Sequence, residues 1–226
     1  MAEHCGLVML RLFFPCAALA MLAACGAVPS AHKTEPLRRS TQVYSPQPDA
    51  QACLAGLGRS DAAFTPLPDQ YYGAGCSALN AVNLVRLRSD SASLGVSNLG
   101  VVACPLAQAF AAWARFGVDR AAQQIMGSPL VKIETMGSYS CRTVAGSGRL
   151  SGHATASAID VSGFVLADGR RISVLDWASP SPQVRAFLQT VHGSACKRFG
   201  TTLGPGYNAA HRDHFHVELS GKAFCR

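Results

Sequence analysis

Two short stretches of the C-terminal half concentrate histidine and aspartate, and around Asp160 and His216 these polar residues alternate with apolar ones. Residues 151–160 read S-G-H-A-T-A-S-A-I-D, and residues 211–219 read H-R-D-H-F-H-V-E-L. Together they contain four of the 7 histidines of the chain. Successive side chains of a β-strand point to opposite faces, so this alternation predicts strands with one polar and one buried face.

The polar face of the last predicted strand carries histidines. His214 and His216 should point to one side, and Phe215 and Val217 should point to the other side, into a core. Asp160 also lies between apolar residues, so its carboxylate should point to the face of its strand that is opposite the core. Rigid strands that present imidazole and carboxylate groups are suitable for holding a metal ion.

His153, Asp160 and His216 form a mixed nitrogen and oxygen donor set. His153 lies seven residues before Asp160, in a loop of small residues that can fold back beside the strand. Zinc enzymes use such sets and leave a fourth position for water, which indicates hydrolytic chemistry. The alternative is that the histidines are ordinary hydrogen-bonded residues and that the aspartate forms a turn.

The N-terminal residues predict export. Residues 12–24 form an uncharged apolar run after Arg11. This run is shorter than the about 20 residues of a transmembrane helix, and it suits the apolar region of a signal peptide. Residues 22–26, L-A-A-C-G, resemble a bacterial lipobox, which is cleaved before a cysteine that is then acylated. We therefore expect a lipoprotein signal peptide over 1–24 and a lipid on Cys25; an ordinary signal peptide is the alternative.

The composition changes after the signal peptide. Residues 27–50 are rich in Ser, Thr, Gln and Pro and poor in apolar residues. Such a segment buries too little surface to offset the entropy of ordering it. We expect a flexible tether over 25–50 and one compact domain over 51–226, a length sufficient for a single core.

The cysteine count agrees with export. Of the 9 cysteines, Cys5 and Cys16 leave with the signal peptide and Cys25 takes the lipid. The even remainder predicts three disulfides, because no C-x-x-C pair supports a zinc–thiolate site. Pairing the nearest partners in sequence gives Cys53–Cys76, Cys104–Cys141 and Cys196–Cys225.

The formal net charge is +7 at pH 7. The basic residues are spread along the chain without interleaved aromatic residues, which argues against a nucleic-acid partner. An anionic polymer of the cell envelope remains a suitable partner, and we expect a monomer.

The remaining patterns predict an α+β domain. We expect helices over 105–124 and 183–198, strands over 131–139, 158–165, 170–175 and 214–219, a turn at 167–169, and a loop-rich segment over 53–75. The strands at 158–165 and 170–175 should form an antiparallel hairpin across that turn.

The motif S-x-H-x-x-x-x-A-x-D followed by H-x-H resembles the LAS metallopeptidases. These include D-Ala-D-Ala carboxypeptidases and dipeptidases, penicillin-insensitive murein endopeptidases and the hedgehog domain. More closely, residues 53–219 resemble the bacterial extensin-like C-terminal domain. The segments that carry the likeness are G-S-Y-S-C-R, G-R-L-S-G-H-A, F-V-L-A-D-G-R-R-I-S-V and L-G-P-G-Y-N-A-A-H-R-D-H-F-H-V-E-L.

The resemblance implies a central mixed or antiparallel sheet with flanking helices, and one zinc ion on His153, Asp160 and His216. The chain departs from the LAS pattern at Ala156, where the family has glycine. A methyl group there is costly if the backbone requires a positive φ.

The resemblance also implies active-site roles for residues that do not bind the metal. His214 is the first histidine of H-x-H, and His211 matches a further histidine of the murein endopeptidases. Asp213 stands at the offset of the dipeptidases' general base, although no Glu-x-x-His is present. Arg142 resembles the arginine that steadies the substrate carbonyl.

These inferences together predict a zinc-dependent peptidase of peptidoglycan, of the DD- or LD-endopeptidase or the carboxypeptidase type. It would be held in the bacterial envelope by its lipid, facing the periplasm, at the outer rather than the inner membrane. One alternative is a non-catalytic, zinc-containing wall-binding lipoprotein, and another is a structural lipoprotein with incidental histidines. A glycosidase is a weaker reading, because it needs two carboxylates across a sugar cleft.

Overall fold

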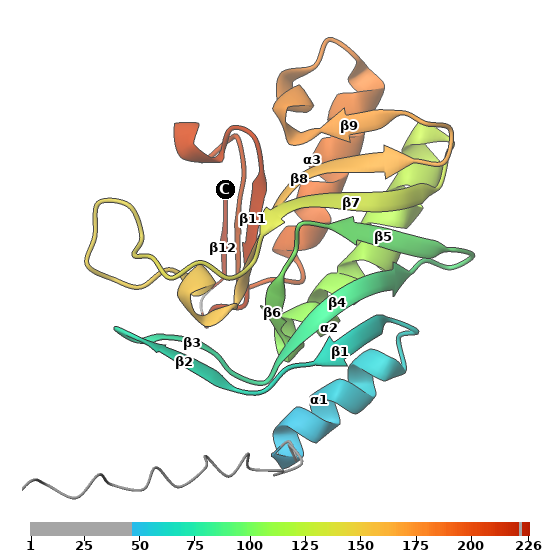
Figure 1. Ribbon diagram of the computed structural model, residues 1–226. Helices are drawn as coiled ribbons and strands as arrows, with labels where there is room; N and C mark the ends of the chain where they lie inside the picture. Colours follow the sequence, from blue (N-terminus) through green and yellow to red (C-terminus); the bar gives the residue numbers. More distant parts are fainter. Residues whose placement is uncertain (1–46, 222) are drawn as a thin grey trace, which may run out of the picture. The chain divides into compact units, whose positions relative to one another are not determined.

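A mixed β-sheet forms the centre of the fold (Figure 1). The computed structural model describes residues 47–221 and 223–226. The predicted signal peptide, the acylated Cys25 and nearly all of the tether lie outside the described residues. The strands are β1 (Ala63–Pro66), β2 (Gln70–Gly73), β3 (Cys76–Ala78), β4 (Ala81–Arg88), β5 (Ser93–Ser97), β6 (Val101–Ala103), β7 (Leu130–Gly137), β8 (Ala158–Leu166), β9 (Arg171–Ser173), β10 (Thr201–Leu203), β11 (Phe215–Glu218) and β12 (Phe224–Cys225).

Ten of these strands, counted over the described residues, join in one sheet with the order β1-β4-β5-β7-β8-β11-β10-β12. β6 pairs with β4, β9 pairs with β8, and β2 and β3 form a separate hairpin. Neighbours in the sheet are antiparallel except for β5–β7 and β10–β12, which are parallel. The predicted α+β class with a mixed central sheet and flanking helices is confirmed.

The described chain has three α-helices; α2 and α3 lie on one face of this sheet, and α1 packs on α2 (Figure 1). They are α1 (Pro48–Gly58), α2 (Cys104–Trp113) and α3 (Pro182–Cys196). Each has proline in its first turn, where the missing N–H costs no intrahelical hydrogen bond. The helical path of α2 continues in π-helical turns over Ala114–Asp119 and Ala122–Met126, until Gly127 adopts a left-handed conformation.

The core lies between the helices and the sheet. The Phe164 ring of β8 contacts Trp113 of α2, Phe187 of α3 and Phe215 of β11, with ring centroids 6.3, 5.4 and 6.5 Å away. All four of these side chains are fully buried. The indole N–H of Trp113 donates to Ser194 Oγ at 3.0 Å, which satisfies its polar atom inside the core.

The expected elements after residue 100 are confirmed, with ends that differ by a few residues. The hairpin of β8 and β9 forms across the turn at 167–169, as predicted. The loop-rich prediction for residues 53–75 is wrong, because α1, β1 and β2 occupy much of this segment. Helix α1 begins at Pro48, and it packs on α2 through a narrow buried edge that includes Cys53 and Leu57. That edge is too short to show a helical period against the surrounding prolines and glycines.

The described residues contain three disulfides, as expected, but two of the predicted pairings are wrong. Cys53–Cys76 and Cys104–Cys141 are replaced by Cys53–Cys104 and Cys76–Cys141, whereas Cys196–Cys225 is confirmed. The error came from choosing partners that are close in sequence. Packing of α1 on α2 brings Cys53 and Cys104 to a Cα–Cα distance of 6.1 Å, although they are 51 residues apart.

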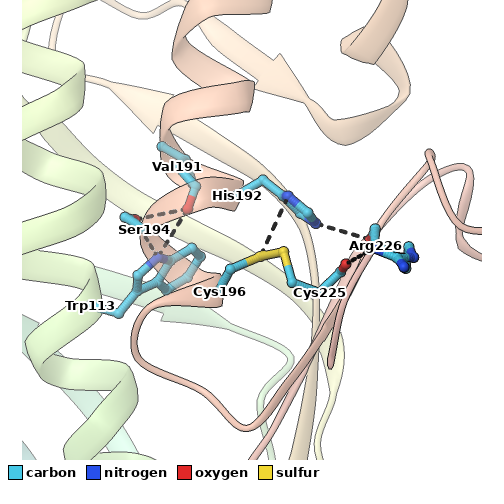
Figure 2. Close-up of a disulfide and its surroundings, with 7 residues drawn as sticks. All are labelled: Trp113, Val191, His192, Ser194, Cys196, Cys225 and Arg226. Carbon is cyan, nitrogen blue, oxygen red and sulfur yellow. Dashed lines mark hydrogen bonds between the residues drawn. A yellow bond between two sulfur atoms is a disulfide. The ribbon is translucent and has the colours of Figure 1, made fainter. Parts of the chain in front are cut away.

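The Cys196–Cys225 disulfide ties the last strand to α3 (Figure 2). Beside it, the Arg226 N–H donates to Thr202 O at 3.0 Å, and the Gly204 N–H donates to Arg226 O at 2.8 Å. The C-terminus is therefore fixed along β10, next to the strand that carries the C-terminal histidines. Nowhere in the described chain is a helix long and apolar enough to span a bilayer.

Candidate metal centre

The three predicted ligands come together on the sheet face opposite the helices. His153 lies in a 3₁₀ turn, Gly152–Thr155, that precedes β8. Asp160 lies in β8 and His216 in β11, and the antiparallel register of these strands pairs the two residues directly. Val161 and Phe215, the next pair of that register, are fully buried in the core. The alternation predicted from the sequence therefore holds at both strands.

The donor atoms of this group are close to one another and mostly shielded from water. His153 Nε2 lies 3.1 Å from Asp160 Oδ2 and 3.2 Å from His216 Nδ1, and His216 Nδ1 lies 2.9 Å from Asp160 Oδ1. His153 and His216 are 3% and 7% exposed. Zinc bonds of about 2.0–2.1 Å in a tetrahedron separate the ligand atoms by about 3.3 Å. The observed spacing therefore fits one small cation.

Carbonyl and carboxylate acceptors orient both imidazoles. His153 Nδ1 lies 2.5 Å from Ser138 O, and His216 Nε2 lies 3.2 Å from Glu218 Oε2. A carbonyl oxygen and an ionised carboxylate can only accept, so both of these ring nitrogens carry the proton. His153 Nε2 and His216 Nδ1 are therefore the ring nitrogens directed to the side of Asp160, and each would offer its lone pair to a metal ion bound there. This is the arrangement that metal-binding histidines require.

The electrostatics of the group follow from its burial and its hydrogen bonds. Burial alone would raise the pKa of Asp160, but hydrogen bonds from His153 and His216 outweigh burial and hold that pKa well below its usual value. For His216, burial lowers the pKa, but Asp160 and Glu218 outweigh it and raise the pKa to about 9. Without a metal ion, His216 therefore holds a proton between two carboxylates. A divalent cation would replace that proton.

The turn that carries His153 ends at a strained residue. Ser151 caps the turn by accepting the His153 N–H at 3.4 Å. Ala156 follows with φ 54° and is fully buried. The positive φ suspected from the LAS glycine is thus present, although the residue is alanine. The left-handed conformation costs about 1–2 kcal/mol, and the methyl group offsets part of this by packing on Ala78 and Ala81.

His214 and Asp213 form a pair beside the donor group. His214 Nδ1 donates to Asp213 Oδ1 at 2.9 Å, which leaves His214 Nε2 free to accept a proton. This Nε2 lies 3.6 Å from Asp160 Oδ1, beyond hydrogen-bond distance. Asp213 is about one third exposed and contacts the group through His214. The structure therefore brings both predicted residues to the site and places the imidazole on the side of Asp160.

His211 also reaches the site. Its ring centroid lies 5.1 Å from that of His214 and 6.0 Å from that of His216. Its Nδ1 bonds to Asn208 Oδ1 at 2.7 Å, an oxygen that also accepts the Ala210 N–H. Burial, with the charges of the neighbouring histidines, lowers the pKa of His211 to about 4. His211 is therefore neutral at pH 7.

Arg142 lies at the base of the exposed loop 141–150. The disulfide from Cys141 to Cys76 and the bridge between Thr143 and Leu150 hold this loop in place. After burial and the neighbouring histidines, the Arg142 charge also lowers the pKa of His211, so the guanidinium is close enough to act on that imidazole.

A second group of potential ligand atoms lies at His192, Cys196 and Cys225 (Figure 2). The two cysteines form a disulfide, so they offer no thiolates. The only remaining ligand type there is one imidazole, and His192 already has Arg226 O at 3.2 Å as a partner of its Nε2. This group is therefore a structural clasp.

Sequence reasoning missed three contributions to the site. They are the carbonyl of Ser138, the amide of Asn208 and the acceptor role of Glu218. Only the last had a sequence signal, because Glu218 alternates with His216 along one strand face.

Fold and site together define an α+β domain with a buried cluster of two histidines and one aspartate, of the kind that can hold a metal ion. Residues 51–226 match the family model described as extensin-like protein C-terminus, and the chain belongs to this family. The predicted membership is confirmed. A comparison with curated proteins found no match, and neither did a comparison with solved structures.

Proposed function

We propose that this chain is a zinc-dependent peptidase that hydrolyses amide bonds in the stem peptides or cross-links of peptidoglycan. The observation that carries the proposal is the convergence of His153 Nε2, the Asp160 carboxylate and His216 Nδ1, within 4.8 Å of one another. Both imidazoles have their outward nitrogen tied to an acceptor, so they are oriented as ligands.

The donor set fits zinc in number and chemistry. Three protein ligands, two imidazole nitrogens and one carboxylate, leave a fourth position open. A zinc ion bound there supplies a Lewis acid and lowers the pKa of water to about 7. His214 does not belong to the group of donors, because its Nδ1 is engaged by Asp213 and its Nε2 lies farther from Asp160 than the donors do.

We assign the proton transfer to His214. Its Nε2 lies 3.6 Å from Asp160 Oδ1, beside the donor group, where it can accept a proton from water and return it to the leaving amine. Asp213 holds the ring and stabilises its charged form through the 2.9 Å hydrogen bond. Arg142 supplies positive charge for the carbonyl oxygen of the scissile amide. His211 is a neutral imidazole at the rim that can hydrogen-bond the substrate.

The substrate and the location rest on the sequence. The motifs resemble those of the LAS peptidases, including the murein endopeptidases, and on that likeness we propose the LAS fold for this domain. The predicted signal peptide, the predicted acylation at Cys25 and the disulfides favour an oxidising compartment outside the cytoplasm. The lipid would hold the domain at a membrane, in the same compartment as the cell wall. In this reading the protein acts as a monomer in the periplasm, held at the outer membrane.

Metal content tests the centre directly. We expect one zinc per chain in the wild type, none after His153→Ala, Asp160→Ala or His216→Ala, and near-stoichiometric zinc after His214→Ala. Asp168→Ala is a matched control, because Asp168 is an exposed aspartate paired with Arg170 in the β8–β9 turn. If His214→Ala loses zinc as completely as His216→Ala does, the site is closed and structural.

Activity is tested on purified sacculi, with product masses to identify the bond. The wild type should release cleaved muropeptides, and His214→Ala and Arg142→Ala should lose most of this activity with zinc retained. Stoichiometric zinc with sacculus binding but no cleavage would instead establish the wall-binding alternative.

A further inference from the structure

We propose that Glu218 is a positioning residue of the metal centre, which holds the His216 ring through its Nε2. We further propose that Gly152 leaves the space that the Glu218 carboxylate occupies. This inference rests on the proposed zinc site and adds a role that the ligand motif does not contain.

Glu218 is on the far side of the His216 ring from the other donors. Its Oε2 lies 3.2 Å from His216 Nε2, whereas His216 Nδ1 faces Asp160 at 2.9 Å. The two ring nitrogens point in different directions, so the bond at Nε2 sets the angle at which Nδ1 faces the other donors. A carboxylate partner also increases the basicity of the ligating nitrogen. The same position makes Glu218 unsuitable as the general base, since its carboxylate contacts the ring nitrogen that does not face Asp160.

The backbone holds Glu218 in this position. Glu218 and His216 are both on β11, on the polar face, and β11 pairs with Ala158 and Asp160 of β8. The Leu219 N–H donates to Ser157 O at 3.3 Å and continues this pairing past the strand end. Glu218 is therefore anchored on both sides of its own residue.

The position of Gly152 is a second, independent observation that supports this role. A Cβ at position 152 would lie 2.6 Å from Glu218 Cδ and 2.7 Å from Glu218 Oε2. These distances are too short for real atoms, so a side chain there would displace the carboxylate. The residue before the proposed ligand His153 thus has no side chain at the place that the Glu218 carboxylate occupies. A substitution at position 152 can therefore displace the Glu218 side chain while residue 218 stays glutamate.

The first test measures the zinc dissociation constant of the full-length protein in detergent, by competition with a chelating dye at pH 7.5. We expect Glu218→Ala to weaken zinc binding about 10–100-fold, as loss of an outer partner does in other sites. Glu218→Gln keeps an acceptor oxygen and should recover most of this loss. Glu134→Gln is the matched control, a partly buried glutamate of β7 paired with Lys132 and Arg171, and its zinc affinity should be unchanged.

The second test is a double-mutant cycle. Gly152→Ala alone should weaken zinc binding because it displaces Glu218, and adding it to Glu218→Ala should cost nothing further. In parallel, the Nε2–H proton of His216 should exchange slowly with water in the zinc-loaded wild type and in Glu218→Gln, as measured by NMR. In zinc-loaded Glu218→Ala this proton should exchange faster, because its acceptor is gone. Circular dichroism establishes that each variant is folded before it is scored.

The outcomes separate this inference from the proposed function. If the wild type binds no zinc, the zinc peptidase itself is refuted. If the wild type binds zinc and folded Glu218→Ala binds it as tightly, with the same exchange rate of the His216 Nε2–H, only the positioning role is refuted. Additive losses from Gly152→Ala and Glu218→Ala would likewise show that Gly152 does not act through Glu218.

Discussion

Removing the metal should make the stability of the domain fall steeply at alkaline pH. In the metal-free protein, Asp160 and Glu218 raise the pKa of His216 from 6.5 to about 9. A group whose pKa is higher in the folded state stabilises the fold fully below its unfolded pKa. That stability is lost as pH rises from about 6.5 through about 9. At about 1.36 kcal/mol per pKa unit, this interval corresponds to about 3 kcal/mol.

The acid side of the same profile should have the opposite slope. The pKa of His211 is lowered to about 4, chiefly by burial, so between pH 4 and 6.5 the unfolded chain binds a proton that the folded chain does not. Stability should therefore rise with pH over this window. The lowered pKa of Asp160 acts in the same direction at still lower pH. The metal-free domain should be most stable near pH 6.5.

Urea unfolding of chelator-treated protein, with disulfides intact, measures this profile through tryptophan fluorescence. The free energy of unfolding should drop by about 3 kcal/mol between pH 6.5 and 9 in the wild type. His216→Gln removes the titrating ring and should flatten most of that slope. Saturating zinc should flatten it as well, because the ion replaces the proton. Equal slopes in the wild type and His216→Gln would refute the reasoning, since the charge on His216 would then contribute nothing.

Three further predictions concern other parts of the chain. Replacing Cys76 and Cys141 together by alanine should cost about 2–4 kcal/mol of stability, since the bridge closes a long loop; zinc content should remain, and unchanged urea unfolding would contradict the bridge. Ala156→Gly should change stability by less than about 1 kcal/mol, because relief of the left-handed backbone offsets the lost methyl contact and the added chain entropy; a loss above about 2 kcal/mol would show that the methyl contact dominates. Cys25→Ser should abolish labelling by a fatty-acid analogue and release the protein from membranes, and persistent labelling would remove the lipoprotein assignment.

The sequence predicted the elements that carry a clear hydrophobic period. Strands β8 and β11 alternate strictly around Asp160 and His216, so both their existence and the face of each side chain followed from the pattern. The buried face of α2, which includes Phe110 and Trp113, likewise shows helical spacing. The same reasoning failed for α1, whose stability depends on packing against α2 and on the Cys53 disulfide. These are tertiary contacts, which no local period records.

For the candidate site, too, some features follow from the sequence pattern and others depend on tertiary contacts. The identity of the donors could be predicted, because imidazole and carboxylate side chains are visible as residue types. Their orientation could not, because it depends on a backbone carbonyl at Ser138 and on the exact position of Glu218. A carbonyl acceptor has no residue signature, since every residue has one. The disulfide pairings failed for a related reason, because distance in space does not follow distance in sequence.

The register between β8 and β11 links the core packing to the geometry of the candidate site. Asp160 faces His216 because the strands pair Val161 with Phe215, and both of these apolar residues are fully buried. A slip of one residue would turn either apolar side chain out of the core and separate the two donors. The core packing therefore fixes the donor geometry. The proline-initiated helices and the disulfide clasp on α3 act on the site through that packing, although none of them contacts it. An intact sheet is thus a precondition for the proposed metal binding, so a site variant that loses zinc is informative only where its fold is shown to be intact.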